Sequence, residues 1–165
     1  MTDDGDRAEV VALRTILAEQ GFEFTEETGT FHLELPGVRK LKTPVRLEVG
    51  PHSLIADAFV CRRPDENFEG VYRWLLERNA RMFAFAFSID ALGDIYLSAR
   101  LPHSMIDADE IDRLLGSALS YADDAFNRIL ELGFASSIRK EWEWRLSTGE
   151  STANLAAFEN LRPRD

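Results

Sequence analysis

Histidine side chains are the first candidates for chemistry, because they ligate metals and move protons near neutral pH. The three histidines, His32, His52 and His103, stand in three different segments, and none belongs to the His-Glu-x-x-His pattern of zinc proteases. We therefore expect them at surface or turn positions, and the sequence predicts no metal site.

Cys61 is the one cysteine of the chain, so no internal disulfide is possible. It ends an apolar run, which favours a buried and inert thiol, because reactive cysteines lie in accessible, electropositive surroundings. Arg62 and Arg63 follow it directly, so a lowered thiol pKa stays open as an alternative.

Motifs that bind phosphate or present a nucleophile are missing from the sequence. It has no glycine-rich phosphate loop and no Gly-x-Ser-x-Gly elbow. Asp90 and Asp94 lack the remaining ligands of a calcium loop, so we interpret them as turn residues. The acidic pairs at 26–27 and 123–124 are predicted to lie on solvated faces. The sequence therefore predicts no catalytic residues and no cofactor, and hence a protein that is not an enzyme.

The strongest candidate for a binding site is aromatic. Trp142 and Trp144 stand close together near the carboxyl end, with Arg145 beside the second. We expect at least one tryptophan to pack on the sheet, and an exposed one beside Arg145 would have the composition of a protein-binding hot spot. Trp74, on a predicted helix, is the fourth candidate partner-binding residue. The glutamates around the tryptophans argue against single-stranded nucleic acid.

The net charge of the chain limits the kinds of partner that it can bind. The 165 residues, a length typical of one domain, hold 19 basic and 29 acidic side chains, a net charge of −10. This balance argues against binding to nucleic acid or to an anionic membrane surface. No apolar run has the length of a membrane span, and the amino end is acidic where a signal peptide is basic. These observations together predict a cytoplasmic protein.

Hydrophobic periodicity indicates the elements that position these residues. Apolar side chains at helical spacing predict a helix over 6–20, with Gly21 as its left-handed cap. Alternating side chains predict strands over 30–35 and 41–49. The more continuous apolar run over 53–62 predicts a third strand that is covered on both faces. A helix over 65–79 follows, with Asp65 or Asn67 as its N-cap.

The second half of the sequence continues with strands and ends with helices. Strands are predicted over 83–90 and 94–101, joined by a turn in which Gly93 supplies a positive φ. The longest helix is predicted over 107–132, where Asp107 and Glu110 resemble a capping box and Gly133 ends the helix. Shorter helices are predicted over 137–146 and 151–161.

The order of elements predicts an α+β fold with an antiparallel sheet of about five strands covered by helices. This order is α-β-β-β-α-β-β-α, followed by a helical carboxyl-terminal tail. Phe31, Leu47 and Phe85 lie at alternating positions of the strands, and we expect the helix that begins at Asp107 to shield them from water.

Several segments carry a family resemblance: 71–79 (VYRWLLERN), 90–97 (DALGDIYL), 100–102 (RLP), 131–134 (ELGF), 141–145 (EWEWR) and 150–158. With this pattern the chain resembles the YbjN family, whose fold is similar to that of type III secretion chaperones. The similarity runs from about Val10 to Phe158. It implies a single YbjN-like domain over 1–165, with a core at 7–133 and a helical extension at 134–162.

The resemblance also bears on function. Secretion chaperones are dimers that hold unfolded segments of client proteins, and the YbjN family brings no established catalytic residues. The helical extension departs from the chaperone pattern, and it lies where it would be able to cover a client surface.

The sequence leads to one main functional hypothesis and two alternatives. The main hypothesis is a non-enzymatic protein-binding module, chaperone-like or a regulatory adaptor, that holds a protein or peptide segment at a sheet edge or in a groove between helix and sheet. The first alternative is a homodimer formed by a helix and the outer strands. The second is a small-molecule sensor with a pocket under the last helices, lined by Trp74, Trp142 or Trp144.

Overall fold

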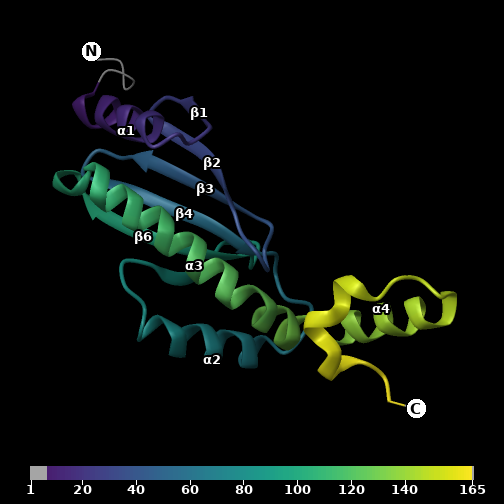
Figure 1. Cartoon of the computed structure of the whole chain (residues 1–165). Coiled ribbons are helices and arrows are strands. Elements are labelled where there is room, and N and C mark those ends of the chain that lie inside the picture. Colours follow the sequence, from purple (N-terminus) through teal and green to yellow (C-terminus); the bar gives the residue numbers. More distant parts are fainter. Residues whose placement is uncertain (1–6, 165) are drawn as a thin grey trace.

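The computed structural model of the chain describes residues 7–164 (Figure 1). Its elements are α1 (Ala8–Glu19), β1 (Phe24–Glu27), β2 (Thr30–Pro36), β3 (Lys42–Val49), β4 (Ser53–Cys61), α2 (Phe68–Asn79), β5 (Ala86–Ile89), β6 (Ile95–Pro102), η2 (His103–Met105), α3 (Ala108–Gly133), α4 (Ala135–Thr148) and η3 (Ala153–Leu161). The predicted order of helices and strands is confirmed, with one additional strand, β1.

The sheet has six strands in the order β1-β2-β3-β4-β6-β5, and all neighbouring strands are antiparallel. The α+β fold is therefore as predicted. The unpredicted strand β1 pairs with β2 through a turn at Thr28 and Gly29, which have φ values of 47° and 75°. Positive φ at both central residues is the requirement of a tight type I′ hairpin.

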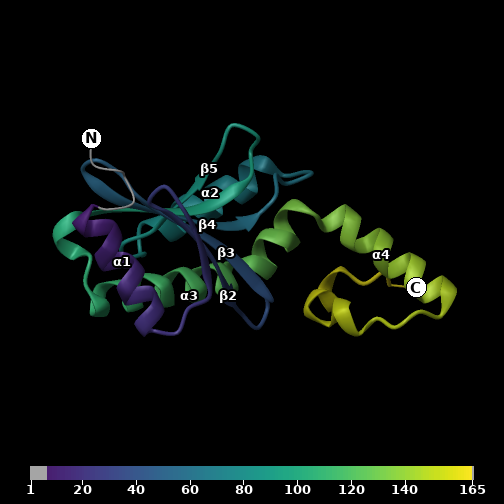
Figure 2. The same cartoon turned by 90° about the horizontal axis from the view of Figure 1, so that it is seen from above.

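The helices cover one face of the sheet. α1 and α3 lie over this face, and α2 packs beside α3 near the β5 edge (Figures 1 and 2). Phe31 and Leu47 are fully buried and Phe85 is 3% exposed, in one apolar cluster with Ile111 and Ile129 of α3. The prediction that the long helix shields these strands is confirmed.

The other face of the sheet stays accessible, so the prediction that the third strand is covered on both faces is wrong. Along β4, Leu54, Ala56 and Ala58 are buried, whereas Ile55 and Asp57 between them are only half-buried. The burial pattern of the strand alternates because the described helices pack on one side of it only. Ile55 and Phe59 make the run look continuously apolar, although they face the uncovered side.

The strand predicted over 83–90 is shorter in the structure, where β5 begins at Ala86. Ala84 has a φ of 65°, which lies outside the extended region and turns the chain before the strand begins. Phe85 and Phe87 are buried, whereas Phe83 before the strand and Ile89 at its end are exposed.

Helix ends follow the predicted residues but not always for the predicted reason. The Asp107 carboxylate accepts a hydrogen bond from the Glu110 backbone N–H at 2.9 Å, as an N-cap should. Asn67 occupies the N-cap position of α2, but its side chain donates to the Leu132 carbonyl instead of capping the helix. Gly133 is required by close packing, because a Cβ atom there would lie 2.8 Å from the Pro64 side chain.

The carboxyl-terminal extension points away from the sheet (Figures 1 and 2). α4 continues beyond the end of α3, and η3 folds back against α4. η3 is a 3₁₀ segment with a kink at Phe158, rather than the short helix expected over 151–161. The extension therefore does not cover the accessible face of the sheet. Within residues 7–164, no helix is both long and apolar enough to cross a lipid bilayer.

Candidate functional site on the open face of the sheet

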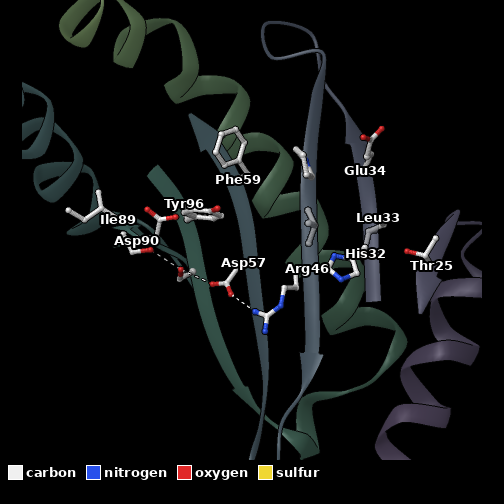
Figure 3. A pocket seen from close by; sticks show the side chains of 14 residues that line it. Thr25, His32, Leu33, Glu34, Arg46, Asp57, Phe59, Ile89, Asp90 and Tyr96 are labelled. Carbon is white, nitrogen blue, oxygen red and sulfur yellow. Dashed lines mark hydrogen bonds and ion pairs between the residues drawn. The ribbon is translucent and has the colours of Figure 1, made fainter. Parts of the chain in front are cut away.

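The face of the sheet opposite α1 and α3, here called the open face, carries outward side chains from all six strands. A pocket of about 860 Å³ lies on it (Figure 3). Strand alternation places these residues together, because every second side chain of a strand projects from the same face. The outward residues that line the pocket are Thr25, His32, Glu34, Pro44, Arg46, Asp57, Phe59, Ser88, Tyr96 and Ser98.

A chain of polar contacts crosses the open face from β3 to β5. The Arg46 guanidinium donates to one oxygen of Asp57 at 3.0 Å, and the Ser98 hydroxyl donates to the other at 2.9 Å. The Ser98 hydroxyl is also 2.8 Å from that of Ser88, and Arg46 pairs with Glu48 as well. Both oxygens of Asp57 are therefore engaged, so this row is a fixed polar floor rather than a free acid or base.

Aromatic and apolar side chains form a wall beside the polar floor. The rings of Phe59 and Tyr96 meet edge to face, with their centroids 5.5 Å apart, and the half-exposed Ile89 lies on the neighbouring strand (Figure 3). Burial raises the pKa of the Tyr96 phenol, and the carboxylates of Asp90 and Asp94 add to this effect. The phenol consequently stays protonated at neutral pH, where it can both donate and accept a hydrogen bond.

At Phe87, the β5 edge of the sheet is already hydrogen-bonded by a side chain. Asn79, at the end of α2, accepts from the Phe87 backbone N–H at 2.7 Å and donates to the Phe87 carbonyl at 3.2 Å. These two groups are the ones that an added strand would use at this position. Strand addition, one of the two binding modes expected from the sequence, is thereby disfavoured at this edge.

The four partner-binding residues expected from the sequence do not form one cluster. Trp142 is buried, but it packs within the extension and not on the sheet, with its indole N–H donating to the Phe158 carbonyl at 3.1 Å. Trp144 is 51% exposed, and the Arg145 guanidinium lies 5.9 Å from its ring. Trp74 stands on α2 against Phe87 of β5. None of the four lines the open-face pocket.

The histidines occupy separate positions. His32 lies on the open face of β2, His52 stands in the turn between β3 and β4, and His103 is on η2, where its ring is 3.0 Å from the Gly50 carbonyl. The Asp90 carboxylate accepts from the backbone of Leu92 and Asp94, which confirms its role in the turn.

The Cys61 thiol is buried, as the main interpretation of the sequence predicts. Burial raises its pKa to about 11 and outweighs the opposing effects of Arg62 and Lys40. The alternative of a lowered thiol pKa is therefore wrong, because desolvation of the thiolate dominates at this position.

The acidic pair at 123–124 was expected on a solvated face, and for Asp123 this expectation is wrong. One oxygen of the Asp123 carboxylate accepts from three consecutive backbone N–H groups, those of Val38, Arg39 and Lys40, at 2.9, 2.7 and 2.9 Å. Asp124 is the exposed member of the pair and contacts Arg39. Asp123 therefore ties the loop between β2 and β3 to α3, a contact that sequence spacing cannot indicate.

Sequence reasoning missed the open face as a site. Its polar residues alternate with core residues along their strands, so they have the ordinary pattern of a solvated sheet face. Only the docking of the helices shows which face stays uncovered. Only the register between strands shows that Arg46, Asp57 and Ser98 are neighbours.

This fold is that of the type III secretion chaperones. The chain matches a chain of "Structure of the heterodimeric complex ExoU-SpcU from the type III secretion system (T3SS) of Pseudomonas aeruginosa" with a TM-score of 0.53 and 20% identity, covering 72% of this chain and 94% of that one. A second match, "Crystal Structure of the ExsC-ExsE Complex", has a TM-score of 0.53 and 19% identity, covering 70% of this chain and 89% of that one.

The chain belongs to the YbjN family, whose model, described as "YbjN: Putative bacterial sensory transduction regulator", matches residues 9–131. The uncharacterized protein Rv0487 of Mycobacterium tuberculosis (strain ATCC 25618 / H37Rv) is 57% identical over 131 residues, which are 79% of this chain and 72% of that protein. The uncharacterized protein ML2442 of Mycobacterium leprae (strain TN) is 56% identical over 129 residues, 78% of this chain and 70% of that protein. The extension from α4 onward lies outside the family match.

Proposed function

We propose that this chain is a non-enzymatic protein-binding module, a chaperone-like or regulatory adaptor, that holds an extended segment of a partner protein on the open face. The observation that carries the proposal is the uncovered pocket, in which an aromatic wall stands beside a fixed polar floor. The two matched structures support it, because they are complexes, one of SpcU with ExoU and the other of ExsC with ExsE.

The shape of the pocket suits an extended chain that crosses the strands. Its lining includes residues of all six strands, from Thr25 on β1 to Ile89 on β5. Six strands spaced about 4.8 Å apart span roughly 24 Å, which is the length of about seven extended residues. The Phe59–Tyr96 corner would take an apolar side chain of the segment.

The charges of the open face favour a basic segment. Three carboxylates, those of Glu34, Asp57 and Asp90, line the pocket against the single guanidinium of Arg46. Asp57 is paired with Arg46, and Glu34 is paired with the largely exposed Lys42, which is not a lining residue. The acidic balance of the whole chain, −10, acts in the same direction by attracting basic partners from a distance.

Selection from a library of ten-residue peptides, followed by affinity measurement, tests this function. We expect wild-type protein to enrich apolar and basic peptides whose affinity falls about tenfold with Tyr96→Ala or Ile89→Ser. Leu41→Ser is the matched control, because Leu41 is an exposed apolar residue that does not line the pocket. A library without enriched peptides, or equal affinity for the pocket variants and the control, would contradict the proposal.

A homodimer is the second candidate function, and exposed apolar side chains favour it. Leu76 on α2, Phe83 in the following loop and Leu92 in the β5–β6 turn are each more than 60% exposed. They belong to consecutive elements at one edge of the sheet, the kind of surface that an isologous interface would cover. Light scattering at high micromolar concentration is the test: a dimer mass that Leu76→Glu reduces to a monomer supports it, and a monomer mass for the wild type excludes it.

Two further expectations stay predictions. One is a cytoplasmic location. The other is partner binding by Trp142, Trp144, Arg145 and Trp74, of which Trp144 offers the accessible ring.

A further inference from the structure

A buried lysine lines a second cavity, separate from the polar floor of the open face. This cavity, of about 530 Å³, is here called the Lys40 pocket and is lined by Lys40, Phe59, Arg62, Phe126, Leu130 and Phe134 among others. Its volume lies within the range of small-molecule sites, roughly 300–1,000 Å³. The side chain of Lys40 is unusual, because lysine is almost never buried without a partner and Lys40 is only 8% exposed.

The fold creates the pocket where two strands part. The pairing of β3 with β4 ends at Val45 and Ala58, although β4 continues to Cys61. Pro44, the residue before Val45 on β3, has no N–H group with which to extend the ladder. The loop that carries Lys40 is held beside this opening by the Asp123 carboxylate, which accepts from the Lys40 backbone N–H.

The Lys40 ammonium uses one of its three N–H donors in a hydrogen bond and has no carboxylate partner among the described residues. Its Nζ donates to the Lys42 carbonyl at 2.5 Å, and it lies 5.5 Å from the centroid of the Phe59 ring and 5.7 Å from that of Phe126. An ammonium has three donors, and a buried charge without a counter-ion is costly. No carboxylate of the described residues forms an ion pair with Lys40.

The other residues that line the pocket also favour an anion, because they include a second cation and no carboxylate. Arg62 is a second cation, whose guanidinium lies 4.4 Å from the Phe134 ring and pairs with Asp65. No aspartate or glutamate is among the residues that line the pocket, although acidic residues exceed basic ones in the chain. Cys61 also lines the pocket, and its thiol, with its pKa raised to about 11 by burial, is neutral and adds no negative charge.

We propose that the Lys40 pocket binds a small monocarboxylate with an apolar or aromatic body. The carboxylate accepts from the spare donors of Lys40 Nζ, and the hydrocarbon body packs against Phe126, Leu130 and Phe134. This site shares Phe59 with the open-face pocket, but its charge and its other walls come from the β2–β3 loop, the end of β4 and α3.

Calorimetric titration of the full chain with decanoate, below its micellar concentration, tests the site. We expect saturable binding of decanoate and no binding of decanol, which has the same chain but no charge. Lys40→Met keeps the apolar stem and removes the ammonium, so decanoate affinity should fall about tenfold or more. The control is Lys42→Met, because the Lys42 ammonium is largely exposed and pairs with Glu34 outside the pocket.

Each outcome decides the proposal. Absence of decanoate binding, equal binding of decanol, or unchanged affinity in Lys40→Met overturns it. A short peptide that ends in a free phenylalanine carboxylate is the second ligand. If the protein binds this peptide but does not bind decanoate, the assignment of the pocket to a small acid is overturned. The comparison of decanoate with decanol needs only wild-type protein, so it holds even if the Lys40 variant does not fold.

Discussion

Phe59 and Lys40 bring the open-face pocket and the Lys40 pocket into contact. The Lys40 ammonium lies 5.5 Å from the centroid of the Phe59 ring, and the same ring meets Tyr96 edge to face at 5.5 Å. Phe59 therefore lines both the open-face pocket and the Lys40 pocket. A change in the position of this ring would therefore alter the shape of both pockets.

Burial of the Lys40 ammonium predicts a pH-dependent effect on stability. Burial lowers the pKa of Lys40 below its usual 10.5, so the unfolded chain binds this proton more tightly than the folded one. The cost of the buried charge is present at neutral pH and disappears as the pH rises toward 10.5. Lys40→Met should consequently be at least as stable as wild type at pH 7, and its advantage should shrink toward pH 10. Urea unfolding of both proteins across this range measures the difference, and an advantage that grows with pH would contradict the prediction.

Asp123 should stabilise the fold more than its neighbour Asp124. Asp123→Ala removes the acceptor of three backbone N–H groups, and we expect a loss of about 1–3 kcal/mol in the free energy of unfolding. Asp124→Ala removes an exposed ion pair with Arg39 and should cost less than about 1 kcal/mol. Chemical denaturation of the two variants is the measurement, and similar losses in both would show that the loop does not depend on Asp123.

Asn79 should protect the β5 edge. Asn79→Ala leaves the backbone N–H and carbonyl of Phe87 without these partners, which should cost about 1–2 kcal/mol and promote self-association through the edge. Glu77→Ala, an exposed change on the same helix, is the control. Denaturation and sedimentation of both variants provide the readout, and a variant that is as stable and as monodisperse as the control would disprove the role of Asn79.

Cys61 should react slowly with thiol reagents in the native protein. The thiol is 5% exposed and burial raises its pKa to about 11, compared with 9.0 for the free group. Little thiolate is therefore available at pH 8, and the labelling rate should be at least about 100-fold lower than in denaturant. The rate of chromogenic disulfide exchange measures this, and labelling as fast as that of free cysteine would mean that the thiol is accessible.

Trp142 should hold the extension together without supporting the sheet. Trp142→Ala removes a buried ring and its hydrogen bond to Phe158, so the amides of 135–162 should lose their protection from hydrogen exchange while the sheet keeps its own. Trp144→Ala, at an exposed position of the same helix, should leave the protection of both regions unchanged. Loss of protection across the sheet in Trp142→Ala would show that the extension and the core fold as one unit.

The accuracy of the sequence predictions followed the strength of the local pattern. Phe31 and Leu47 alternate with polar neighbours, so their burial was predictable from the strand period. β1 was not predicted, because only Phe24 of its four residues is apolar, and the remaining signal is the single Gly29 of its turn. Burial of one tryptophan was predictable, but the expectation that it packs on the sheet was wrong. The Trp142 indole donates to the Phe158 carbonyl within the extension, and Phe158 reaches Trp142 only after the chain reverses direction.

The order of helices and strands, the apolar stripe of each and the membership of the YbjN family were contained in the sequence alone. Each of these depends on residues within a few positions of one another, or on a linear pattern. The tertiary structure decided that one sheet face stays open, that Arg46, Asp57 and Ser98 form a row, and that Lys40 is buried among aromatic rings without an anion. These relationships depend on where α3 docks and on the register between strands, which bring residues distant in the sequence within bonding distance.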